Sequence, residues 1–101
     1  MEIKKVLEKE LIKNLKKQEL LNQEIDSLPL GSLVKIKQHN NIYCYLKYRK
    51  DDKVISKYIG KEDDINVMKL ELDLAHKKNL INKLKSLKED EVLINKMMKL
   101  K

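Results

Sequence analysis

The sequence predicts an α+β domain: a long helix, a three-stranded antiparallel meander and a second long helix. Residues 1–30 and 62–101 carry apolar residues at helical spacing among Lys, Glu and Gln. Residues 31–61 instead alternate β-branched and aromatic residues with Lys, and they hold all four tyrosines, the one cysteine and the one arginine. Because the chain has 101 residues, we expect it to form a single domain.

The first helix is expected over residues 1–28. Its apolar residues fall on one broad stripe: Ile3, Leu7, Leu11, Leu15, Leu21, Ile25 and Leu28. Pro29 and Gly31 end the helix, because proline lacks an N–H donor and glycine permits a left-handed turn. Asn14 and Gln18 interrupt the stripe, and we expect them to lie at its margin in contact with water. The alternative is that they are seam residues that fix the register of paired helices.

The meander is expected over residues 31–60, and its middle strand has two different faces. Ile42, Cys44, Leu46 and Tyr48 point to the face that can be buried, with Ile55 and Ile59 of the third strand. Tyr43, Tyr45, Lys47 and Arg49 point to the other face. A two-residue turn at Asp51 and Asp52 fixes the pairing of the last two strands. The expected pairs are Tyr45 with Tyr58, Lys47 with Ser56, and Arg49 with Val54.

The first strand has two possible registers, because the length of the loop that follows it is ambiguous. One register places Val34 and Ile36 on the buried face. The other buries the side of the strand that carries Lys35 and Lys37. We choose the first, because it leaves two ammonium groups in water.

The second helical segment is expected over residues 62–101, with Glu62, Asp63 and Asp64 in an acidic first turn that complements the helix dipole. Ser86 and Glu89 have the spacing of a capping box. Either a short C-terminal helix begins there, or one helix continues through it. Such long helices exceed what a three-stranded sheet can cover. We therefore expect them to pack on each other as in a coiled coil, on a second copy, or on a partner.

The central segment also holds most of the net charge. Residues 31–61 carry eight basic and two acidic residues, which accounts for six of the seven net positive charges of the chain. Tyrosines among cations suit nucleic acid, because rings stack on bases while cations neutralise phosphates. The expected nucleic-acid-binding residues are Lys35, Lys37, Tyr43, Tyr45, Lys47, Arg49, Lys50, Lys53 and Tyr58. DNA is favoured over RNA, since a β-ribbon fits the major groove of B-form DNA. The alternative is that the lysines only protect a small sheet from aggregation.

The sequence offers little for catalysis, and we expect no enzymatic activity, no cofactor and no metal. His39 and His76 have no carboxylate at ligand spacing. Cys44 has no histidine partner and is expected to be an inert buried thiol. We also expect a cytoplasmic location without membrane binding, because the chain has neither a signal-peptide pattern nor a long apolar run.

Two resemblances rest on the central segment. The runs GSLV, IYCYLKYR and KVISKYIG resemble a family of small uncharacterised bacterial proteins with a GSL start, a tyrosine-rich strand and a glycine turn before a basic strand. Asp52 stands where that family has its turn glycine. The run KYRKDDKVISKY is more weakly similar to the arm-type DNA-binding domains of tyrosine recombinases. That similarity implies a three-stranded sheet placed in the major groove.

A second function class fits the same sequence. The helical stripes could dock on a partner protein or a second copy, with the basic face gripping an acidic surface. The chain would then be a protein-interaction module or a small phage-encoded inhibitor, of the anti-CRISPR kind, that binds a host nuclease. The expected partner or dimer positions are Leu7, Leu11, Leu70, Leu74 and Ile81. A partner of the whole chain is thus either nucleic acid, a nucleic-acid-binding protein, or a homodimer mate.

Overall fold

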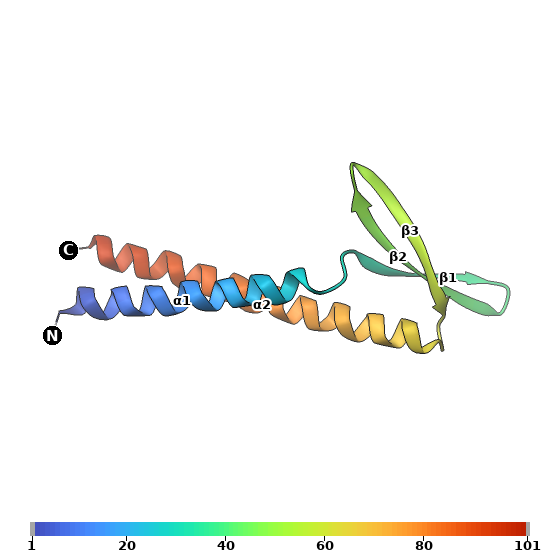
Figure 1. The fold of residues 1–101 in the computed structure, drawn as a ribbon, viewed down its shortest axis with the longest axis horizontal. Helices are drawn as coiled ribbons and strands as arrows, with labels where there is room; N and C mark the ends of the chain where they lie inside the picture. Colours follow the sequence, from blue (N-terminus) through green and yellow to red (C-terminus); the bar gives the residue numbers. More distant parts are fainter. Residues whose placement is uncertain (1, 101) are drawn as a thin grey trace. The chain divides into compact units, whose positions relative to one another are not determined.

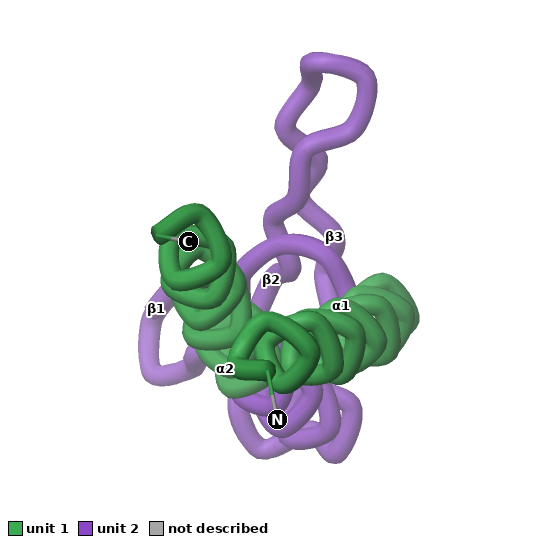
Figure 2. Tube along the Cα trace, turned by 90° about the vertical axis from the view of Figure 1, so that its left-hand side faces the viewer, with its two compact units in different colours: residues 1–27, 78–101 green, residues 28–77 purple. Residues whose placement is uncertain are grey.

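The computed structural model describes residues 2–100 and confirms the α+β order (Figure 1). Its elements are α1 (Ile3–Asp26), β1 (Ser32–Gln38), β2 (Asn41–Lys50), β3 (Lys53–Lys61) and α2 (Ile65–Lys99). The chain divides into two compact units (Figure 2). We call residues 1–27 with 78–101 the helix pair, and residues 28–77 the sheet unit. Helix α2 belongs to both, because its first part lies in the sheet unit.

Helix α2 differs from its prediction at its start. The backbone N–H of Asn66 donates to Oδ1 of Asp64 at 2.7 Å, so Asp64 caps the helix. Glu62 and Asp63 precede the helix, and its first turn holds no acidic residue. Helix α2 then continues through Ser86 without a break, so the separate C-terminal helix does not form.

Neither α1 nor α2, over the residues described, is long and apolar enough to cross a membrane.

The sheet has the strand order β1-β2-β3, and both neighbouring pairs are antiparallel. The predicted β2–β3 register is confirmed, since Tyr45 pairs with Tyr58, Lys47 with Ser56 and Arg49 with Val54. The two-residue turn is confirmed as well. Asp51 and Asp52 have φ values of 51° and 63°, and such positive values allow a tight turn to match the twist of the strands.

The predicted register of β1 is wrong. Val34 pairs with Tyr45 and Ile36 with Tyr43, so both lie on the tyrosine face. Lys35 pairs with Cys44 and therefore lies on the opposite face. Its ammonium group is not stranded there, because it contacts Glu62 at 3.5 Å and Glu71 of α2 at 3.3 Å. These ion pairs remove the cost on which the prediction relied, while the tyrosine rings provide apolar neighbours for Val34 and Ile36.

The core of the sheet unit lies on the face away from the tyrosines. Cys44 and Val67 are fully buried there, and Leu70 is nearly so. Gly31 packs directly on β2, with a φ of 98° that favours glycine. A Cβ atom at this position would overlap the backbone carbonyl oxygen of Lys47. Gly31 therefore allows the chain to approach the backbone of β2.

The helix pair has a small core, in which α1 runs antiparallel to the second part of α2 (Figure 1). Its buried apolar side chains are Leu7, Leu80 and Leu84. Asn14 and Gln18 are also buried, at 6% and 8% exposure. The expectation that they contact water at the margin of the stripe is therefore wrong.

Hydrogen bonds explain how the two amides are buried. Nδ2 of Asn14 donates to the carbonyl oxygen of Leu87 at 2.8 Å. Nε2 of Gln18 donates to Oδ1 of Asn14 at 2.6 Å and to Oε1 of Glu91 at 2.7 Å. The bonds to Leu87 and Glu91 join α1 to α2, and the bond between Gln18 and Asn14 links the two amides within α1. This polar cluster favours one register of the two helices.

Candidate nucleic-acid interface

Three tyrosine rings gather on the sheet face that points away from the core. The ring of Tyr58 lies 5.3 Å from that of Tyr45 and 6.3 Å from that of Tyr43, both tilted. Such spacing is typical of favourable aromatic pairs. Tyr43 and Tyr45 are half-buried, whereas Tyr58 is 50% exposed. Partial burial and the neighbouring tyrosines raise the pKa of Tyr58, so its hydroxyl stays a neutral donor at physiological pH.

An irregularity in β3 adds Lys61 to this face, a residue that the sequence analysis missed. Tyr45 pairs with Tyr58, but Cys44 pairs with Gly60, so Ile59 is an extra residue in β3. Beyond this bulge, Lys61 pairs with Tyr43 and shares its face. The signal in the sequence is Gly60, because glycine within a strand often marks a bulge.

Lys47 and Arg49 extend the face toward the β2–β3 turn. Strand β1 pairs with β2 only as far as Lys47, so residues 48–50 and 53–55 form a two-stranded end. Lys47, Arg49, Lys50 and Lys53 are all exposed. No ion pair joins any of these four cations to a carboxylate of residues 2–100. Their charges are thus available to an external anion.

Not all of the predicted residues lie on one face. Lys50 and Lys53 pair with each other at the end of the hairpin, on the side opposite Arg49. Lys35 and Lys37 alternate with Val34 and Ile36, so they lie on the face away from the tyrosines. The hydrogen bond and charge of Glu71, with the charge of Glu62, raise the pKa of Lys35. Lys35 therefore has internal partners, and we remove Lys35 and Lys37 from the interface.

The reactive or titratable side chains elsewhere in the sheet unit have structural roles or lie in a turn. Burial raises the pKa of the Cys44 thiol, so it stays protonated and a poor nucleophile. Asp64 caps α2, and Glu71 pairs with Lys35. His39 lies in the β1–β2 turn with a φ of 56°. Within residues 2–100, no three His, Cys, Asp or Glu side chains lie close enough together to hold a metal ion.

Most of the residues predicted to contact a partner are buried or half-buried within this chain. Leu7 and Leu70 are buried, in the helix pair and the sheet unit respectively. Leu11 and Leu74 are half-buried, and Ile81 is exposed. We therefore assign the first four to the packing of the chain itself.

Comparison with protein-family models, with curated proteins and with solved structures gave no match. The resemblances seen in residues 31–60 stay predictions. The surface itself must therefore support any functional conclusion.

Proposed function

We propose that this protein binds nucleic acid, without catalysing a reaction, through the tyrosine face and the basic hairpin end. We call this surface the ribbon. It comprises Tyr43, Tyr45, Lys47, Arg49, Lys50, Lys53, Tyr58 and Lys61. The observation that carries the proposal is the β2–β3 register, which aligns Tyr45, Lys47 and Arg49 on one side of the sheet. The α2 contacts of the sheet lie on the other side.

The ribbon supplies both kinds of contact that nucleic acid needs. Its exposed cations can neutralise phosphates, and this sets affinity and salt dependence. The exposed Tyr58 and the half-buried Tyr43 and Tyr45 can contact bases, sugars or phosphates. Arg49 can also read a guanine edge with its forked guanidinium group. Charge and aromatic contact therefore lie within one short stretch of sheet.

Duplex DNA is the ligand that fits the ribbon best. The end of the ribbon has two strands, and the major groove of B-form DNA admits a two-stranded ribbon. The major groove of A-form RNA is too narrow for side chains to read. We therefore expect affinity to decrease from duplex DNA to single strands and then to duplex RNA.

Fluorescence anisotropy with labelled duplex DNA, single-stranded DNA and duplex RNA tests the proposal. If Lys47, Arg49, Lys50 and Lys53 contact phosphates, the logarithm of affinity falls with the logarithm of salt with a slope of about −3.5. The double variant Lys47→Ala/Arg49→Ala should weaken binding at least about tenfold and reduce that slope by about two. Tyr45→Leu keeps an apolar neighbour for Val34, and we expect it to weaken binding about tenfold through lost ring contacts.

Lys37→Ala is the matched control, because it removes one exposed cation from the opposite face of the same sheet. It should change binding much less than Lys47→Ala. Equal losses for the two single variants would show that general charge, rather than the ribbon, attracts the nucleic acid. Absence of binding to all three probes at low salt would reject the proposal. The alternative would then be that the ribbon binds an acidic surface of a partner protein.

A further inference from the structure

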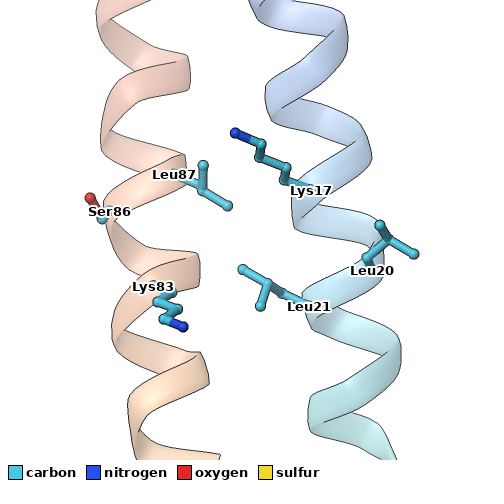
Figure 3. Close-up of a pocket in the computed structure, with 6 residues that line it drawn as sticks. All are labelled: Lys17, Leu20, Leu21, Lys83, Ser86 and Leu87. Carbon is cyan, nitrogen blue, oxygen red and sulfur yellow. The ribbon is translucent and has the colours of Figure 1, made fainter.

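Two strongly exposed apolar side chains, Leu20 and Val54, have different surroundings. Leu20 is 65% exposed and lines an open groove of the helix pair, in which Leu21 and Leu87 point toward each other (Figure 3). Apolar side chains of the helix pair thus have apolar neighbours. Val54 is 63% exposed at the two-stranded end of the ribbon, and the residue directly opposite it in the strand register is Arg49. Val54 therefore presents two methyl groups to solvent beside a cation.

Val54 belongs to a square of four side chains on one face of the hairpin. Arg49 pairs with Val54 and Lys47 pairs with Ser56, and all four residues are exposed. Directly opposite residues of an antiparallel pair have Cβ atoms about 4.5–5.5 Å apart. Successive bases of a DNA strand are about 3.4 Å apart along the helix axis. Arg49 and Val54 are therefore close enough to contact the same base pair or two adjacent ones.

The major groove presents a different pattern of groups for each base pair. Guanine presents the acceptors O6 and N7, which match two donors of an arginine side chain, and thymine presents a C5 methyl group. The side chain of valine forms no hydrogen bonds, so it suits the methyl group of thymine. Against the amino group of cytosine or adenine it would leave a donor unpaired, which costs binding free energy. A guanidinium beside an exposed valine is therefore complementary to a guanine beside a thymine.

We infer that Arg49 and Val54 together read one step of duplex DNA in the major groove, a guanine next to a thymine. Arg49 donates hydrogen bonds to O6 and N7 of the guanine, and the methyl groups of Val54 contact the C5 methyl of the thymine. Lys50 and Lys53 lie on the other side of the hairpin end, where they can contact the phosphates that border the groove. This inference rests on the proposed function, since it assigns a sequence preference to the same surface.

Removing single groups from the DNA tests the inference on the unmodified chain. The probe is a labelled duplex of about 14 base pairs, slightly more than one helical turn, with alternating thymine and guanine on one strand. Replacing each thymine with uracil removes the methyl group and keeps every hydrogen-bonding group. By fluorescence anisotropy, this change should weaken binding about fourfold, the factor expected for one buried carbon group. Replacing guanine with 7-deazaguanine removes the N7 acceptor and should weaken binding at least about fivefold.

Two matched variants show whether Val54 is the residue that contacts the methyl group. Val54→Ser should reduce the ratio of thymine-duplex to uracil-duplex affinity to about one, because the variant and the uracil remove the same contact. Ile36→Ser is the control. Ile36 is a β-branched residue on the tyrosine face, 41% exposed, but it lies in β1 outside the two-stranded end. It should keep the fourfold ratio, and tyrosine fluorescence checks that the sheet of each variant is folded.

The outcomes separate this inference from the proposed function. Equal affinity for the thymine and uracil duplexes would overturn the inference and leave nucleic-acid binding by the ribbon in place. A thymine preference that persists in Val54→Ser would also overturn it, because another group would then contact the methyl. So would an unchanged affinity for the 7-deazaguanine duplex, because Arg49 would then not contact guanine N7. Absence of binding to every duplex would overturn both the inference and the proposed function.

Discussion

The helix pair and the sheet unit treat polar groups in opposite ways. The helix pair buries two amides, Asn14 and Gln18, while leucines and isoleucines along both helices stay exposed. The sheet unit buries Cys44 and Val67 completely, and none of its lysines is buried. Both units expose large apolar side chains, among them Val54 and Leu72 in the sheet unit. The two units therefore differ chiefly in whether polar side chains belong to the core.

The chain carries a natural probe for each unit. It has no tryptophan, and all four tyrosines lie in β2 and β3. Tyrosine fluorescence therefore reports the sheet unit. Helix α1 and most of α2 lie in the helix pair, so ellipticity at 222 nm reports mainly that unit. Comparing the two signals shows whether the units unfold separately or as the single domain that the length predicts.

We expect the largest effect from Leu80→Ala, because Leu80 is 3% exposed in the small core of the helix pair. The change should cost about 3 kcal/mol of unfolding free energy. It should lower the midpoint of the 222 nm transition by about 10 °C or more. The tyrosine transition should move less. Val92→Ala is the control on the same helix, since Val92 is 55% exposed. Equal shifts of both signals would show that the two units unfold as one.

Gly31→Ala should act mainly on the sheet unit, whereas Leu80→Ala acts mainly on the helix pair. Its positive φ and the overlap with the Lys47 carbonyl should together cost about 2 kcal/mol. The tyrosine transition should therefore fall by several degrees, with a smaller shift at 222 nm. Ser32→Ala changes the neighbouring exposed residue and should be close to neutral. An unchanged tyrosine transition would mean that the chain reaches β2 without a tight approach at Gly31.

Asn14→Leu should have the smallest effect on stability. The apolar side chain avoids burying an amide, but one N–H of Gln18 loses its Asn14 acceptor, so the two contributions largely offset and the free energy of unfolding should change by less than about 1 kcal/mol. Gln18 keeps its bond to Glu91. Without Asn14, α1 and α2 should pack in more than one register. An NMR spectrum should then show additional amide cross-peaks for the helix pair. Asn22→Leu, at an exposed position of α1, should leave a single set of peaks. A single set for Asn14→Leu would show that packing alone fixes the register.

Several features of the fold followed directly from local patterns. The alternation of residues in β2 and the two-residue turn at Asp51 and Asp52 were enough to predict the β2–β3 register. That register brings Tyr45, Lys47 and Arg49 to one face. Much of the candidate interface was therefore predictable, because turn length and strand period are both properties of adjacent residues.

Other features depended on residues far apart in the chain. Lys35 lies opposite Cys44 because Glu62 and Glu71 supply its counter-charges, and no local pattern reveals those contacts. Lys61 joins the tyrosine face only through the bulge at Ile59. Asn14 is buried because the carbonyl of Leu87, 73 positions away, accepts its hydrogen bond.

The sequence by itself determined which segments are helix and strand, and it concentrated the net charge in residues 31–61. These properties arise from the periodic order of neighbouring side chains. Only the tertiary structure decided which lysines keep internal partners, which amides are buried, and which leucines remain in water. Those outcomes depend on pairing between distant segments, because a buried polar group is stable only where another part of the chain supplies its partner.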